Sequence, residues 1–244
     1  MISRLFRPIR VGSLLGIPIR VSPAVFVLLL LLVWNFSQHT DAGATGQLLV
    51  LLLTLGVSLL THELAHALVG RRLGLTVFDI TIWPLGGMAR MDGLRDNPHL
   101  EAPVAAAGPI ANLLLALGCW LIPGNFADSA AAINLVLGLG NLLPAFPLDG
   151  GRILRAWLSR YAPAPAATRA AVTISNWLLW VMLLVGAWIG SFWIVALLCA
   201  FLYWAGRMEL METVLRHGTM PVMEPSEVLS KAFKGDADGT KIEE

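Results

Sequence analysis

Three ionisable side chains stand together in the stretch "SLLTHELAHALVGRRLG", residues 58–74, which follows a run that is apolar from Leu48. His62 and His66 are four residues apart. In a helix such residues share one face, about 6 Å apart along the axis, so both imidazoles can reach a single ion. Glu63 stands beside the first histidine, where its carboxylate can hold a water molecule. The spacing therefore predicts a metal site with a general base next to it.

The pattern HExxH is typical of zinc peptidases, in which two histidines bind the metal and the glutamate is the general base and then the proton donor. The alternative is a pair of helix-packing histidines beside a charged surface residue. In this chain that surface would be lipid or protein interior, where an ionisable side chain costs on the order of 2.5–3.5 kcal/mol. The cost favours a site, with His62 and His66 as ligands of one Zn²⁺ and Glu63 as the base.

A catalytic zinc site takes three protein ligands and leaves one position open for water. The best third candidate is Asp149, in "GNLLPAFPLDGGRILRA", three residues before Arg152; His66 lies five residues before Arg71. By helical rise both are within about 5–8 Å of the same membrane boundary. The alternative is a turn aspartate before Gly150. The remaining histidines are expected in a loop, an interfacial stretch and the tail, namely His39, His99 and His217.

The composition is that of an integral membrane protein. Of 244 residues, 57% are hydrophobic and 14% are charged, whereas soluble domains average about 45–50% and about 25%. The predicted fold is an all-α polytopic membrane protein with six transmembrane helices, because about 20 apolar residues cross the hydrocarbon. The expected spans are 23–38, 47–69, 102–122, 129–147, 171–190 and 192–210.

The segments outside the spans complete the predicted organisation. Residues 1–22 are expected to be a cytosolic or interfacial N-terminal segment, 23–215 the six-helix domain and 216–244 a flexible cytosolic tail. Within the domain, "VFDITIW" alternates and is followed by two glycines, so a β-hairpin or small sheet is predicted at about 75–92. We further hypothesise that residues 76–83 form an edge strand that pairs with an unwound substrate.

The basic residues indicate the orientation. With six spans and a cytosolic N-terminus, all 17 Lys and Arg residues fall on the cytosolic side, as cytoplasmic flanks require. The net charge of +1 therefore conceals an asymmetry that reflects topology and does not indicate nucleic-acid binding. Cys119 and Cys199 lie inside apolar runs, so neither a disulfide nor a thiol metal site is expected.

The motifs together resemble the site-2 protease family of intramembrane zinc metalloproteases. The similarity extends from residue 12 to about 158. It includes "GIPIRV", HELAH, "PLGG", "AGPIAN" and the Asn-Pro-Asp-Gly signature in "NLLPAFPLDGG". Six spans without room for a PDZ domain look most like the sporulation-type branch. Ser22 departs from that branch, which often has a histidine there, and the short tail leaves no room for its CBS pair.

The resemblance implies that His62, His66 and Asp149 bind zinc, that Glu63 is the acid and base, and that Asn141 stands near the scissile carbonyl. By its own position Asn141 can donate a hydrogen bond to a developing oxyanion or can form an interhelical hydrogen bond that only packs. Asn112 is interpreted as such a packing residue.

The function expected from these residues is cleavage of a membrane-tethered protein in or near its transmembrane segment, which releases a cytosolic fragment. The substrate could be a tethered transcription factor or its inhibitor, the surroundings are the lipid bilayer of a bacterial or archaeal cell, and no nucleic acid is involved. The alternative is a catalytically silent membrane protein that binds metal or acts as an adaptor. Retention of Glu63, which is not a ligand, favours hydrolysis.

Overall fold

The computed structural model describes residues 7–84, 86–94, 97–217 and 223–238. Two compact units are found, one made of residues 1–95 and 107–139, the other of 96–106 and 140–244. The boundary between them passes through helix α4 (Pro98–Trp120) and helix α5 (Asn125–Asn141).

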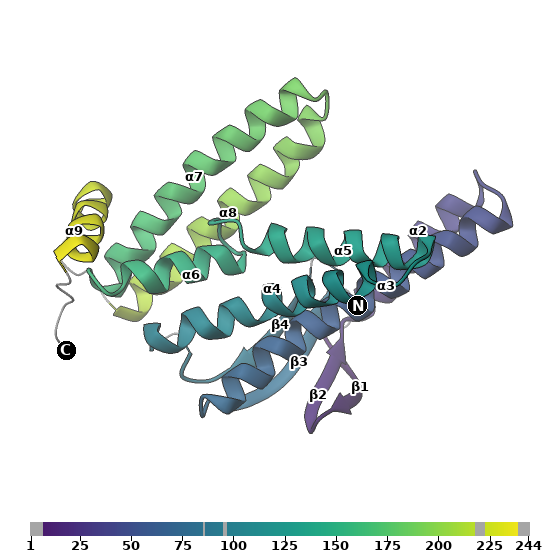
Figure 1. Ribbon diagram of the computed structural model, residues 1–244, viewed down its shortest axis with the longest axis horizontal. Coiled ribbons are helices and arrows are strands. Elements are labelled where there is room, and N and C mark those ends of the chain that lie inside the picture. Colours follow the sequence, from purple (N-terminus) through teal and green to yellow (C-terminus); the bar gives the residue numbers. More distant parts are fainter. Residues whose placement is uncertain (1–6, 85, 95–96, 218–222, 239–244) are drawn as a thin grey trace. The chain divides into compact units, whose positions relative to one another are not determined.

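Helix α3 (Ala42–Arg72) is the longest element of the first unit and carries the HExxH pattern. Asp41 caps its first turn by accepting a hydrogen bond from the Ala44 N–H at 2.7 Å. Arg71 and Arg72 occupy its last turn, where positive charge complements the helix dipole. Its 31 residues are about 46 Å long at 1.5 Å per residue, more than the hydrocarbon thickness of about 30 Å. The helix runs beside α2 (Pro23–Ser37), as Figure 1 shows.

A four-stranded sheet packs against α3 within this unit (Figure 1). Its strands follow the order β1 (Ile9–Leu14), β2 (Ile17–Val21), β3 (Val77–Trp83) and β4 (Gly86–Met91). The predicted hairpin at 75–92 is present as β3 and β4, which pair antiparallel. The strands β1 and β2 were not expected, and β2 joins β3 in parallel, with Ile19 opposite Ile80.

The strand order corrects one hypothesis. Residues 76–83 do not form an edge strand, because β3 is hydrogen-bonded to β2 on one side and to β4 on the other. The pairs with β2 are at Ile80, Thr81 and Ile82, so this part of β3 uses its backbone groups on both sides. The edge next to α3 is β4, which contacts that helix directly.

Small residues let α3 approach the sheet closely. Ala67 is fully buried against Ile17, Ile19 and Ile80 in one apolar cluster. A Cβ added at Gly70 would lie 2.5 Å from the Met91 sulfur, so glycine lets the Met91 side chain lie against the helix. The helix therefore lies close enough to β4 for one of its side chains to reach the strand's backbone.

A buried carboxylate ties three strands of the sheet together. The Asp79 side chain on β3 is 1% exposed and accepts hydrogen bonds from Arg90 on β4 and from the Thr81 hydroxyl, and it pairs with Arg20 on β2 at 3.2 Å. The hydrogen bond from Arg90 lowers the pKa of the Asp79 carboxyl, although burial acts in the opposite direction. Asp79 therefore forms ion pairs with Arg20 and Arg90 that stabilise the sheet.

The second unit is built on an antiparallel pair, α7 (Ala164–Trp188) and α8 (Phe192–His217). A tight turn joins them at Gly190, whose φ of 76° suits glycine. Helix α6 (Asp149–Leu158) packs on α7, and α9 (Pro225–Asp238) packs on both (Figure 1). Thus a helix occupies part of the stretch 216–244 for which a flexible tail is predicted.

Not all six expected spans are long enough to cross a bilayer unaided. In the described residues four helices are long and apolar enough, namely α3, α4, α7 and α8. Helix α2 is apolar but has 15 residues, and α5 has 17. The fourth expected span, 129–147, is wrong at its end: α5 stops at Asn141, because Pro144 and Pro147 cannot continue the hydrogen-bond ladder.

Candidate metal centre

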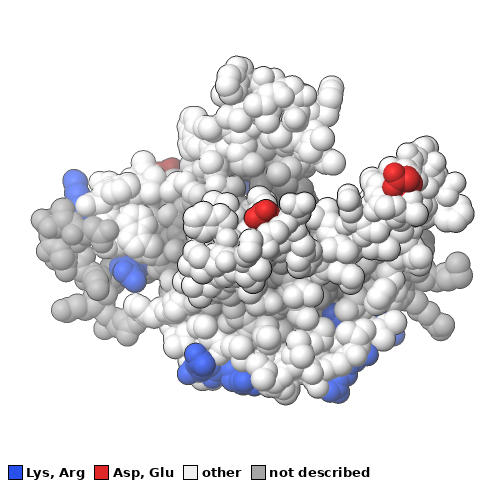
Figure 2. Space-filling view, turned by 45° about the vertical axis from the view of Figure 1, so that its right-hand side comes forward, with Lys and Arg blue, Asp and Glu red and all other residues white. Residues whose placement is uncertain are grey.

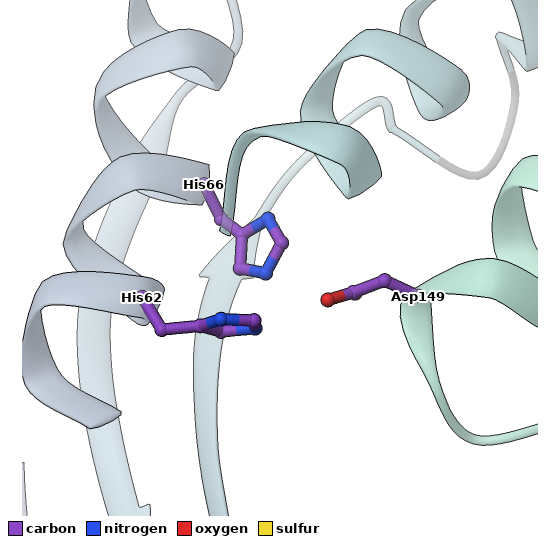
Figure 3. Close-up of side chains that lie close together, drawn as sticks. All are labelled: His62, His66 and Asp149. Atoms are coloured by element: carbon purple, nitrogen blue, oxygen red, sulfur yellow. The ribbon is translucent and has the colours of Figure 1, made fainter. Parts of the chain in front are cut away.

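The two histidines of the HExxH pattern lie side by side on α3, in the first unit. His62 is 4% exposed and His66 is 6% exposed, and their ring centroids are 4.6 Å apart. Figure 3 shows both imidazoles projecting from α3. The predicted common face is therefore confirmed.

Helix α4 leaves a space in front of these imidazoles. A Cβ built on Gly108 would lie 2.4 Å from Nε2 of His66 and 2.6 Å from Nε2 of His62. Both Nε2 atoms therefore converge on a position that any side chain at residue 108 would fill. Two buried imidazole nitrogens that converge on such a space fit a zinc ion, which binds His nitrogen at about 2.0–2.1 Å.

Glu63 is held beside this pair by the sheet. Its Oε2 accepts a hydrogen bond from the Ala89 N–H of β4 at 2.9 Å. A Cβ at Gly87 would lie 2.4 Å from the Glu63 Cγ, so glycine is needed where the side chain crosses the strand. Glu63 is 7% exposed, and among the described residues the hydrogen bond from Ala89 goes to one of its two carboxylate oxygens. Gly87 thus has a direct part in placing the base.

Asp149 is the first residue of α6, in the second unit, and is 6% exposed. Leu148 precedes it in an extended conformation, which lets the helix start there. A Cβ at Gly150 would lie 2.2 Å from the Leu142 carbonyl oxygen, so this glycine lets the preceding loop fold against the first turn. The Asp149 carboxylate, labelled in Figure 3, is an oxygen donor of the kind that zinc binds.

The loop before α6 is held by side chains that no sequence pattern singled out. Ser175 on α7 accepts a hydrogen bond from the Phe146 N–H at 3.3 Å and donates one to the Pro144 carbonyl at 3.1 Å. Arg155 stacks on the Phe146 ring and pairs with Glu101 and Glu209. These contacts hold both ends of the segment that presents Asp149.

The other candidates occupy separate positions. Asn141 is the last residue of α5 and is half-buried. His39 lies in the exposed turn between α2 and α3. Asn112 has a buried contact with a histidine of the HExxH pair, since its Oδ1 lies 2.5 Å from Nδ1 of His62.

Comparison with known proteins agrees with this geometry. The family model of peptidase family M50 matches residues 50–127 and 122–185. A solved structure, the site-2 protease from Methanocaldococcus jannaschii, is similar over 84% of this chain and 95% of its own, with a TM-score of 0.63 and 31% identity. A protein of that organism named zinc metalloprotease is 33% identical over 82% of this chain, and stage IV sporulation protein FB of Bacillus subtilis is 30% identical over 59%.

The HExxH helix of this chain is buried and packs on a small sheet. The chain shares its fold with that site-2 protease. The chain belongs to peptidase family M50, whose model matches more than half of it. It spans 60% of the length of the archaeal relative and 51% of the Bacillus relative.

Proposed function

We propose that this chain is an intramembrane zinc endopeptidase that cuts a membrane-tethered protein in or near its transmembrane segment and releases a cytosolic fragment. The observation that carries the proposal is Glu63. It is a buried carboxylate on a long apolar helix, beside two convergent imidazoles, and is held by the backbone of β4. A protein that only stored metal would have no use for a carboxylate placed in this way.

In this proposal His62, His66 and Asp149 hold one zinc ion. When bound, zinc lowers the pKa of a water molecule toward about 7 and polarises a carbonyl. Glu63 takes the proton from the attacking water on its carboxylate and later gives a proton to the leaving amine nitrogen. Asn141 is proposed to donate its amide N–H to the scissile carbonyl oxygen as negative charge develops there.

The test is cleavage of a tethered reporter by the purified chain in detergent or vesicles. Treatment with a zinc chelator is expected to stop cleavage, because the three donors then hold no ion, and added Zn²⁺ is expected to restore it. Reporter fragments are followed on gels. Cleavage that continues in chelated, metal-free protein would show that the activity is not zinc hydrolysis, and zinc binding without any cleavage would favour the silent alternative.

Substrate binding is proposed to use the edge of β4. A transmembrane helix must be unwound before its peptide bond can be attacked, and the freed backbone groups need new partners where lipid offers none. An edge strand supplies them by strand addition. β4 is an edge strand and its Ala89 N–H already contacts Glu63, so a substrate paired along β4 would lie beside the base.

Crosslinking can locate this contact. Cysteine at Met88, an exposed position on β4, is expected to crosslink to cysteines near the cut site of a trapped reporter, in a Glu63→Gln chain whose Cys119 and Cys199 are replaced by alanine. Cysteine at Phe78, equally exposed but on the interior strand β3, is the control. Crosslinks formed as readily at 78 as at 88 would contradict pairing along β4.

Six spans with both termini in the cytosol are proposed for the membrane, with α2 and α5 as short spans. Within the first unit the basic residues support this orientation, because Arg71 and Arg72 end α3 and Asp41 caps its other end. Figure 2 shows basic side chains along its lower edge, at the height where Figure 1 places the sheet. A reagent that cannot cross the membrane, added from outside, is expected to label a cysteine placed at Ala44 but not one placed at Gly93. Labelling at 93 and not at 44 would contradict this orientation.

A further inference from the structure

A chain of buried amides ends on the zinc-binding histidine His62. Asn112 on α4 is 0% exposed and Asn134 on α5 is 3% exposed. Asn134 Nδ2 lies 2.9 Å from the Ala130 carbonyl oxygen, Asn112 Nδ2 lies 2.7 Å from Asn134 Oδ1, and Asn112 Oδ1 lies 2.5 Å from His62 Nδ1. All of these residues belong to the first unit.

The direction of the hydrogen bonds in this chain is fixed by backbone carbonyls. The Ala130 carbonyl can only accept, so Asn134 must turn its NH₂ group toward it and its oxygen toward Asn112. Asn112 must then donate from its own NH₂ group to that oxygen. A second acceptor confirms this orientation, because Asn112 Nδ2 is also 3.4 Å from the Ser58 carbonyl, one turn before His62 on α3. The Asn112 oxygen is left facing His62.

An oxygen without a hydrogen can only accept, so His62 must carry its proton on Nδ1. Its Nε2 is then free of hydrogen and keeps the lone pair that a metal needs. This is the atom near which a Cβ of Gly108 would lie. Gly108 and Asn112 are four residues apart on α4, so they lie on one face of that helix. Asn112 is next to Nδ1 of the His62 ring and Gly108 is next to Nε2.

We propose that Asn112, oriented by Asn134 and the Ser58 carbonyl, is the positioning residue that sets the Nδ1–H tautomer of His62 and aims its Nε2 at the metal. The proposal rests on the zinc site proposed above. It assigns a role to Asn134, which has no part in the hydrolysis itself. It also replaces the interpretation of Asn112 as a residue that only packs.

Zinc affinity, measured by competition with a chelator, tests the proposal without any substrate. Asn112→Leu is expected to weaken zinc binding about 10- to 100-fold, the range found when partners of ligating histidines are removed. Asn112→Asp is made in an Asn134→Leu chain, so that its second oxygen does not face Asn134 Oδ1. It keeps an oxygen that accepts from Nδ1 and is expected to bind zinc more tightly than Asn112→Leu in the same chain. Thr61→Val is the control, because within the described residues the hydroxyl of Thr61, beside His62, bonds only to the Val57 carbonyl of its own helix. Equal losses for Leu and Asp would leave Asn112 a packing residue and overturn the proposal.

The role of Asn134 is tested by a double-mutant cycle. Asn134→Leu is expected to weaken zinc binding by less than Asn112→Leu, because the Ser58 carbonyl still orients Asn112. Once Asn112 is leucine, Asn134→Leu is expected to change the zinc affinity no further, since its only path to His62 runs through Asn112. Losses that simply add would show that Asn134 acts independently and would overturn this part.

The tautomer can also be read in the wild-type chain, where folding of variants is not in question. With ¹⁵N-labelled histidine, the His62 signals, assigned by their loss in His62→Gln, are expected to show hydrogen on Nδ1 and metal on Nε2. The opposite tautomer would overturn the proposal. If His62→Gln leaves the zinc affinity unchanged, the proposed zinc site is wrong. If His62→Gln abolishes zinc binding but Asn112→Leu does not weaken it, the zinc site stands and only the positioning role of Asn112 is wrong.

Discussion

Glu63→Gln is expected to abolish peptide hydrolysis while the chain keeps about one zinc. Glutamine has nearly the same shape, and its oxygen can still accept the hydrogen bond from the Ala89 N–H, so the position over β4 is retained. It cannot take a proton from water at neutral pH. Loss of a positioned general base lowers rates by about 10²–10⁴-fold. Cleavage of the tethered reporter and zinc content per chain are the two measurements.

Ligand variants supply the contrast for this result. His66→Ala and Asp149→Ala are expected to lose zinc affinity and activity together, because each removes a donor. Glu63→Gln should separate the two properties. Wild-type cleavage by the glutamine variant would end the peptidase mechanism, and wild-type zinc affinity in Asp149→Ala would show that Asp149 is not the third ligand.

Gly108→Ala is expected to abolish zinc binding. The added methyl would lie 2.4 Å from Nε2 of His66 and 2.6 Å from Nε2 of His62, in space that the metal needs. We expect zinc affinity to fall by about 100-fold or more, as loss of well-placed ligand geometry does. The methyl also forces the two buried imidazoles to shift, so we expect the metal-free chain to unfold at a lower temperature, although alanine is favoured over glycine inside a helix by about 0.8–1 kcal/mol. Chelator competition and metal-free thermal unfolding measure the two effects.

Gly118 gives a matched control on the same helix. It also lies in α4, but a Cβ there would meet nothing within 4 Å. Gly118→Ala is therefore expected to leave both zinc affinity and reporter cleavage unchanged. If Gly108→Ala bound zinc as well as Gly118→Ala does, the two imidazoles would not converge on the space in front of α4, and the assignment of both Nε2 atoms as ligands would be wrong.

The sequence by itself determined whatever depends on local spacing. His62 and His66 share a face because a helix repeats every 3.6 residues, whatever surrounds it. The hairpin of β3 and β4 follows from an alternating pattern and two glycines within 15 residues. The membrane class follows from composition, and the break after Asn141 could have been placed from Pro144, because proline ends helices by its own geometry.

Only the tertiary structure decided what depends on contacts between distant segments. β2 pairs with β3 across more than 50 residues and turns a supposed edge strand into an interior one, and no local pattern specifies such a partner. Asn112 meets His62 across 50 residues, and Gly108 faces the same ring. In the sequence these two are a glycine and an asparagine in an apolar helix. Both residue types are also common where membrane helices merely pack against each other, so the sequence does not reveal their role. What gives them a role is the direction of a hydrogen bond and the space left by a missing side chain, and both exist only once α3 and α4 lie against each other.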